Sequence, residues 1–215
     1  MKLKKFVIII FTVFLLTLQC VMANIKPYNS SDIALDAIGM YQVPNYITVY
    51  KEPNEKSKVL YRANWSQKFF NCSLGDMEDI FTVYIANKNL ALVQVVDYTD
   101  DWVKIIYDKS EHKTGWLKAE DIRFMTWRNF MNTYARRYGL YLFKDIPVEN
   151  RILYSGITDN AQQLQSITGK PLKITLTAIK GNMILVTAIE NNVGKTGFLK
   201  WRTDEGKIYV FPAIR

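Results

Sequence analysis

The chain has 215 residues, of which 49% are hydrophobic and 13% are aromatic, and its formal net charge is +8. This composition is typical of a compactly folded protein and excludes an intrinsically disordered chain. The basic residues are spread along the sequence without a block of like charge, which argues against nucleic acid as a partner.

Residues 1–23 have the pattern of a secretory signal peptide. Three lysines stand near the start, an apolar run follows over 6–18, and Val21-Met22-Ala23 supplies small residues before a cleavage site. We therefore expect Asn24 to begin an exported protein, periplasmic or extracellular, with no integral membrane span after cleavage. An uncleaved N-terminal anchor and lipidation at Cys20 remain alternatives.

Removal of residues 1–23 leaves a net charge of +5 and one cysteine, Cys72. An intrachain disulfide is then impossible. Phe69, Phe70 and Leu74 surround Cys72 in the sequence and favour burial, with pairing between two chains as the alternative.

Short segments with alternating apolar and polar residues predict an all-β protein. In chain order, the expected strands cover 47–51, 58–62, 90–96, 102–107, 140–144, 151–155, 172–178 and 184–189, with further strands at the Gly-Trp-Leu and Gly-Phe-Leu triplets.

The segment 126–139 is the exception, because its apolar residues have helical spacing. Trp127, Phe130, Met131, Tyr134 and Tyr138 fall on one helical face. Thr126 can cap the start of this helix, and Gly139 can end it. We expect the apolar face to pack against the β structure; a helix lying on a membrane surface is the alternative.

The phrase KTGWLK at 113–118 returns as KTGFLK at 195–200. The match extends without a gap over 101–118 and 183–200, which places Trp102 over Ile184. A second gapless match places 49–61 over 142–154. These matches predict an internal duplication, with about eleven additional residues of the first copy lying within 62–88.

The order of short strands in both copies, over about 47–122 and 140–212, resembles the bacterial SH3-like (SH3b) family. Val49-Tyr50 with Pro53, Trp102-Val103-Lys104-Ile105, and Thr114-Gly115-Trp116-Leu117 stand where that family has its ordered motifs. The opening arginine and Gly-Pro of the family are missing, and the second copy has Ile184 and Phe198 in place of tryptophans. These departures weaken the expectation that the second copy binds a ligand.

The resemblance implies a mainly β fold with two small SH3-like β-barrels in tandem, joined by an amphipathic helix. The expected organisation is a signal peptide (1–23), an N-terminal extension (24–46), barrel 1 (47–122), a linker helix (123–139) and barrel 2 (140–215). Glycine before the aromatic residue would let two backbones approach closely, and the aromatic ring would fill the barrel interior or line its mouth.

No residue set in the sequence predicts catalysis, a metal site or a cofactor. The single histidine, His112, shares one turn with Ser110 and Asp108, which is too local for a catalytic triad. Ile189 stands where a phosphate-binding loop ending at GKT (194–196) requires glycine. The acidic run at 75–79 lacks the ligand spacing of a calcium loop. We expect a non-enzymatic protein.

The candidate binding residues are aromatic: Tyr50, Trp102, Tyr107 and Trp116. The SH3b resemblance implies that they line a shallow groove for a cell-envelope peptide or glycan, with peptidoglycan as the main candidate. Trp116 and Phe198 can alternatively be core residues. The alternative function is a periplasmic scaffold or inhibitor that binds an envelope protein through the insertion near 69–80.

Overall fold

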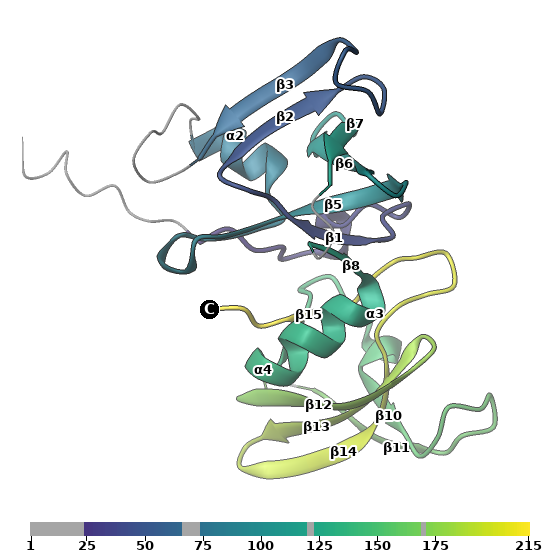
Figure 1. Ribbon diagram of the computed structural model, residues 1–215. Helices are drawn as coiled ribbons and strands as arrows, with labels where there is room; N and C mark the ends of the chain where they lie inside the picture. Colours follow the sequence, from purple (N-terminus) through teal and green to yellow (C-terminus); the bar gives the residue numbers. More distant parts are fainter. Residues whose placement is uncertain (1–23, 66–73, 120–122, 169–170) are drawn as a thin grey trace, which may run out of the picture.

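The computed structural model describes residues 24–65, 74–119, 123–168 and 171–215. Two antiparallel sheets lie one above the other, with a helix between them (Figure 1). The fold is therefore mainly β, as predicted. The expected signal peptide, Cys72 and part of the expected insertion lie outside the described residues.

The first sheet has the strand order β3-β2-β7-β6-β5-β1-β8, with β4 paired to β5. Its elements are β1 (Gly39–Gln42), β2 (Tyr46–Tyr50), β3 (Val59–Asn64), β4 (Val83–Ile85), β5 (Leu90–Tyr98), β6 (Trp102–Asp108), β7 (Lys113–Lys118) and β8 (Phe124–Thr126), together with helix α2 (Leu74–Ile80) and the short 3₁₀ helices η1 (Ser30–Asp32) and η2 (Ala86–Lys88).

The second sheet has the order β11-β10-β14-β13-β12-β9-β15. Its elements are β9 (Leu140–Leu142), β10 (Ile152–Tyr154), β11 (Gln163–Ser166), β12 (Lys173–Lys180), β13 (Met183–Glu190), β14 (Val193–Lys200) and β15 (Val210–Pro212), with the 3₁₀ helix η4 (Val148–Arg151). If β4 is left aside and the strands of each half are numbered along the chain, both sheets have the same strand order, 3-2-6-5-4-1-7.

The strands that the structure describes do not form the expected closed barrels. The end strands of the first sheet, β3 and β8, are not paired with each other, and neither are β11 and β15 of the second. The physical reason is the way apolar surface is buried. The inner face of the second sheet packs against the helix and the first half, and Met77, Ile80 and Phe81 help to cover the inner face of the first sheet, so neither sheet needs to close on itself to bury its apolar side chains.

The helix predicted at 126–139 is confirmed over 127–138. It runs through α3 (Trp127–Phe130), a π-helical stretch η3 (Met131–Ala135) and α4 (Arg136–Tyr138). The Thr126 hydroxyl accepts a hydrogen bond from the Asn129 N–H at 3.4 Å. The predicted apolar face is the buried one, because Trp127, Phe130 and Met131 belong to the core.

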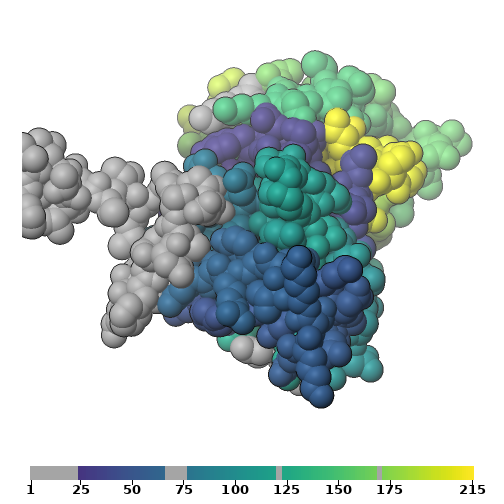
Figure 2. Space-filling view, turned by 90° about the horizontal axis from the view of Figure 1, so that it is seen from above, coloured from purple at the N-terminus to yellow at the C-terminus, as the bar shows by residue number. Residues whose placement is uncertain are grey.

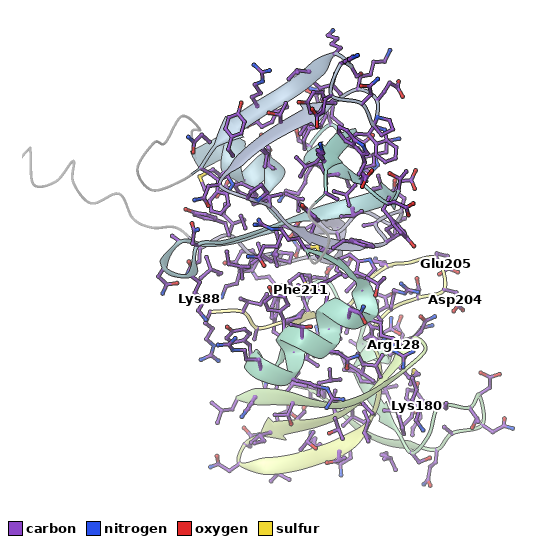
Figure 3. The ribbon with its side chains drawn as sticks, viewed as in Figure 1. Lys88, Arg128, Lys180, Asp204, Glu205 and Phe211 are labelled. Atoms are coloured by element: carbon purple, nitrogen blue, oxygen red, sulfur yellow. The ribbon has the colours of Figure 1, made fainter. Side chains whose placement is uncertain are left out.

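One hydrophobic core joins the two sheets. It combines Met40 and Leu92 of the first sheet with Phe130 of the helix and with Ile184 and Phe211 of the second half. The Phe211 ring lies between the helix and the first sheet (Figure 3) and is 5.2 Å from the Phe130 ring, centroid to centroid. Burying such a side chain contributes about 1.5–3 kcal/mol to folding. The two sheets therefore stabilise each other.

A second core lies on the other side of β5 and belongs to the first sheet alone. It includes Ala91, Val93 and Val95, whereas Leu90 and Leu92 face the shared core. Because β5 is covered on both faces, it is buried continuously from Leu90 to Val95, and its apolar sequence follows from this position.

The N-terminal segment binds the second half of the molecule. The Tyr141 hydroxyl donates a hydrogen bond to the Pro27 carbonyl at 2.5 Å, and the Ser30 N–H donates one to the Asp145 carboxylate at 2.7 Å. The segment 24–46, which we expected to lie outside the first barrel, also supplies β1 to the first sheet between β5 and β8.

Candidate binding site

The four predicted binding residues do not form one cluster. Tyr50 and Trp102 meet edge to face, with ring centroids 5.7 Å apart, and Trp116 is the direct cross-strand partner of Tyr50. Tyr107 instead stacks on Tyr61, with centroids 5.8 Å apart. Tyr50, Trp102 and Trp116 are called the aromatic strip below.

The aromatic strip lies on the outer face of the first sheet. Along β6, Val103 and Ile105 are buried while Trp102 and Lys104 are half-buried. Because successive side chains of a strand point to opposite faces, Trp102 lies opposite to the core residues. Trp116 alternates with the buried Leu117 in the same way. Of the two positions predicted for the Trp116 ring, the barrel interior is therefore wrong.

Lysines border the strip. Lys104 is the cross-strand partner of Trp116, and its Nζ lies 5.8 Å from the centroid of the Trp116 ring. Lys118 is the cross-strand partner of Trp102 and pairs with Glu55 in the β2–β3 loop. The hydrogen bond from Lys118 to Glu55 raises the pKa of the Lys118 ammonium group. The surface thus combines flat rings with positive charge.

The β2–β3 loop forms an exposed rim beside the strip. Its residues 51–56 are all exposed, and the blue loop projects at the edge of the face shown in Figure 2. A shallow surface of this kind suits an extended ligand better than a small compact one.

Tyr107 lies in a separate recess of about 340 Å³, lined also by Tyr61, Asp79 and Lys113. Tyr107 is an odd number of residues from Trp102 along β6, so alternation places it on the face of the buried Val103 and Ile105, where it packs against the core of the first sheet.

The second sheet carries a counterpart of the strip. The cross-strand partners of Phe198 are Tyr154 and Leu185, as Tyr50 and Lys104 are those of Trp116. Met183 pairs with Lys200 as Trp102 pairs with Lys118. Trp102 therefore corresponds to Met183, not to Ile184 as the gapless match had it. Ile184 is fully buried.

The match of 49–61 with 142–154 is also wrong as a structural correspondence. β10 occupies the place of β2, and β9 occupies the place of β1. The glycines of the repeated phrase confirm this. A Cβ added at Gly115 would lie 3.0 Å from the Tyr50 carbonyl oxygen, and one added at Gly197 would lie 3.0 Å from that of Tyr154. The predicted close backbone approach at these glycines is thus found in both sheets.

A recess of about 610 Å³ adjoins this counterpart surface. Tyr154, Met183 and Lys200 line it together with Lys180 and Asp204, which Figure 3 shows on the same side of the molecule. Asn182 donates a hydrogen bond to the Asp204 carboxylate at 2.6 Å. The second sheet thus offers a recess with charged and polar lining residues where the first offers tryptophans.

The residues considered for catalysis do not assemble into a triad. The Ser110 hydroxyl donates to Asp108 at 2.7 Å, whereas His112 Nε2 lies 3.2 Å from the Asp36 carboxylate. Within the described ranges, no group of three or more His, Cys, Asp or Glu side chains is placed to hold a metal ion. No helix among the described residues is long and apolar enough to cross a membrane.

The expected insertion is largely structural where the structure describes it. In α2 and the residues after it, Met77, Ile80 and Phe81 are buried in the core of the first sheet. Lys109 links the β6–β7 turn to the residues after α2, because its Nζ donates a hydrogen bond to the Phe81 carbonyl at 3.0 Å. Burial lowers the pKa of Lys109, and Asp32 and Asp79 oppose that shift.

No protein-family model matches the chain, and no curated protein matches it.

Proposed function

We propose that the protein is an exported, non-catalytic binding module whose aromatic strip recognises an extended peptide or glycan of the cell envelope, with peptidoglycan as the first candidate. The observation that carries the proposal is the position of Tyr50, Trp102 and Trp116 together on the outer face of one sheet. Half-buried tryptophans on an outer face contribute little to the core and offer a large contact area to a ligand.

The chemistry of the strip fits such a ligand. Aromatic rings pack against sugar rings and peptide planes at a small cost in side-chain entropy, and Lys104 beside Trp116 supplies positive charge for carboxylates. The SH3b-like order of motifs and the signal-like residues 1–23 support a cell-envelope role. The common strand order of the two sheets supports an origin by duplication.

The experiment is a co-sedimentation assay of the protein from Asn24 onward on purified peptidoglycan. Wild type should sediment with the polymer, and Trp102→Ala should bind at least tenfold more weakly, because aromatic anchors dominate the binding energy of such surfaces. Tyr98→Ala is the matched control, because Tyr98 is an exposed aromatic residue outside the strip and contacts Phe124 instead.

Circular dichroism spectra of both variants should match that of wild type, so that a loss of binding reports the surface. Wild-type protein that stays in the supernatant, or equal binding by the two variants, would contradict the proposal. A protein partner would then be the remaining candidate ligand.

A further inference from the structure

A second cavity lies away from the aromatic strip, at the junction of the two halves. It has a volume of about 540 Å³ and is bordered by the N-terminal segment, by β9 and by the last residues of the chain. The C-terminal end, marked in Figure 1, lies between the two sheets. Apolar side chains form much of its lining, including Leu140, Leu142, Phe143 and Ala213. This volume is in the range of small-molecule sites.

The charged side chains of the cavity are all basic. Lys26 and Arg215 come from the two terminal segments, and Lys144 and Arg151 come from the region after β9. None of the described lining side chains is acidic. The acidic neighbour Asp145 is held by the Ser30 N–H and hydroxyl groups.

These cations lack protein counterions among the described residues. The Nε of Arg151 is buried without a hydrogen-bond partner, although its Nη2 donates to the Ile146 carbonyl at 3.3 Å. The Nζ of Lys144 lies over the Tyr28 ring, 4.9 Å from the centroid. An unpaired buried N–H of a guanidinium group is costly, and an anion can satisfy it.

Lys26 supports the same conclusion. Burial lowers the pKa of its ammonium group, and the positive charge of Arg215 lowers that pKa further. Two like charges held close together at a partly buried site repel each other, so an anion bound between them stabilises both.

We propose that this cavity binds an amphipathic anion, in which a carboxylate or phosphate head contacts the four basic side chains and an apolar chain lies along the β9 lining. Arginine favours this recognition because its planar fork matches the oxygens of carboxylate and phosphate. Fatty acids and phosphorylated lipids share the chemistry. The inference is independent of the aromatic strip.

Isothermal titration calorimetry of the purified protein tests the proposal with dodecanoate, dodecyl phosphate and dodecyl maltoside, each below its micelle-forming concentration, and with inorganic phosphate. At least one of the two anionic amphiphiles should bind one to one in the micromolar range. Inorganic phosphate and the neutral amphiphile should bind at least tenfold more weakly, because each lacks half of the required chemistry.

The two anionic amphiphiles distinguish the sources of the ligand. Preference for dodecanoate indicates a fatty acid, and preference for dodecyl phosphate indicates a phosphorylated lipid. Equal binding of the neutral amphiphile, or no binding of either anionic one, would overturn the proposal.

Variants assign the binding to this cavity. The double substitution Lys26→Gln/Lys144→Gln should weaken binding at least tenfold. It spares Arg151, whose hydrogen bond to Ile146 can contribute to folding. The matched control is Arg128→Gln/Lys180→Gln, which removes the same charge on another side of the molecule (Figure 3). Equal loss in both double variants would indicate a general charge effect and contradict the site. Trp102→Ala should leave this binding unchanged.

Discussion

The outer faces of the two sheets share a scaffold but differ in side chains. Trp102 in the first sheet has Met183 as its counterpart, and Trp116 has Phe198. The tyrosine of the strip is retained, as Tyr50 and Tyr154. The inward-facing neighbours Leu117 and Leu199 are both buried aliphatic residues. The comparison teaches that the inner face of this architecture is constrained by packing, whereas the outer face can acquire a different binding chemistry in each sheet.

The largest expected effect tests whether the stability of both sheets depends on the close approach of two backbones at the glycine of the repeated phrase. Gly115→Ala and Gly197→Ala should each destabilise the protein by about 1–3 kcal/mol, with the larger effect at Gly115. A Cβ there would lie 2.5 Å from Val49 Cγ1, compared with 2.9 Å from Leu153 Cβ at Gly197. Thermal unfolding should show a decrease in Tm of about 2–4 °C per kcal/mol.

Gly156→Ala provides the control for the glycine variants, because its added Cβ would meet only Ala161 Cβ, at 3.7 Å. Its Tm should stay within about 2 °C of the wild-type value. If Gly197→Ala lowered the Tm no more than this control does, Gly115 and Gly197 would occupy corresponding positions without contributing equally to stability.

An intermediate effect is expected when the two outer faces are made alike. Trp102→Met gives the first sheet the residue of the second, and peptidoglycan binding should decrease about tenfold because the indole contact area is lost. Met183→Ala should leave that binding unchanged. Sedimentation of both variants with the polymer measures the difference, and a decrease for Met183→Ala would instead place the ligand on the second sheet.

The smallest effect concerns the hairpin turns. The Ser110 hydroxyl and then the Glu111 N–H lower the pKa of Asp108 from 3.8 to about 2. A lowered pKa in the folded state stabilises the protein above the unfolded-state pKa, and this contribution is lost as the pH falls from about 4 to 2. Asp108→Asn should therefore be less stable than wild type at pH 6 and equal to it near pH 2. Solvent screening keeps the difference below about 1 kcal/mol.

The corresponding turn of the second sheet gives the contrast. Asn191 and Asn192 close it in the left-handed region, with φ of 50° and 63°, a conformation that asparagine tolerates better than alanine. Asn192→Ala should destabilise the protein by about 1 kcal/mol at all these pH values. Urea unfolding at pH 6 and pH 2 compares the two turns. A pH-dependent difference between wild type and Asn192→Ala would contradict this distinction.

Local patterns were sufficient for much of the fold. Alternation located β5, β6, β12 and β13 to within a few residues, and helical spacing identified the buried face of Trp127, Phe130 and Met131. These elements were predictable because each carries its own hydrophobic period. β11 (Gln163–Ser166) was not predicted, because its sequence QLQS is largely exposed and has no apolar alternation.

The candidate site was less predictable, because the face of the sheet toward which a side chain points depends on the register of its strand. A gapless match placed Trp102 over the buried Ile184, whereas the hydrogen-bonded ladder places it with Met183. A shift of one residue moves a side chain to the opposite face of a sheet. Likewise, Tyr107 was grouped with Trp102, although strand alternation places the two side chains on opposite faces of β6.

The core shared by Met40, Phe130 and Phe211 has a consequence for how the chain can be divided. A cut between residues 122 and 123 would not release two autonomous modules, since each fragment would expose the apolar surface that the other covers. The protein should instead unfold in one cooperative transition. Both sheets then contribute to a single free energy of unfolding. A binding residue that destabilises one sheet can therefore be offset by tighter packing in the other.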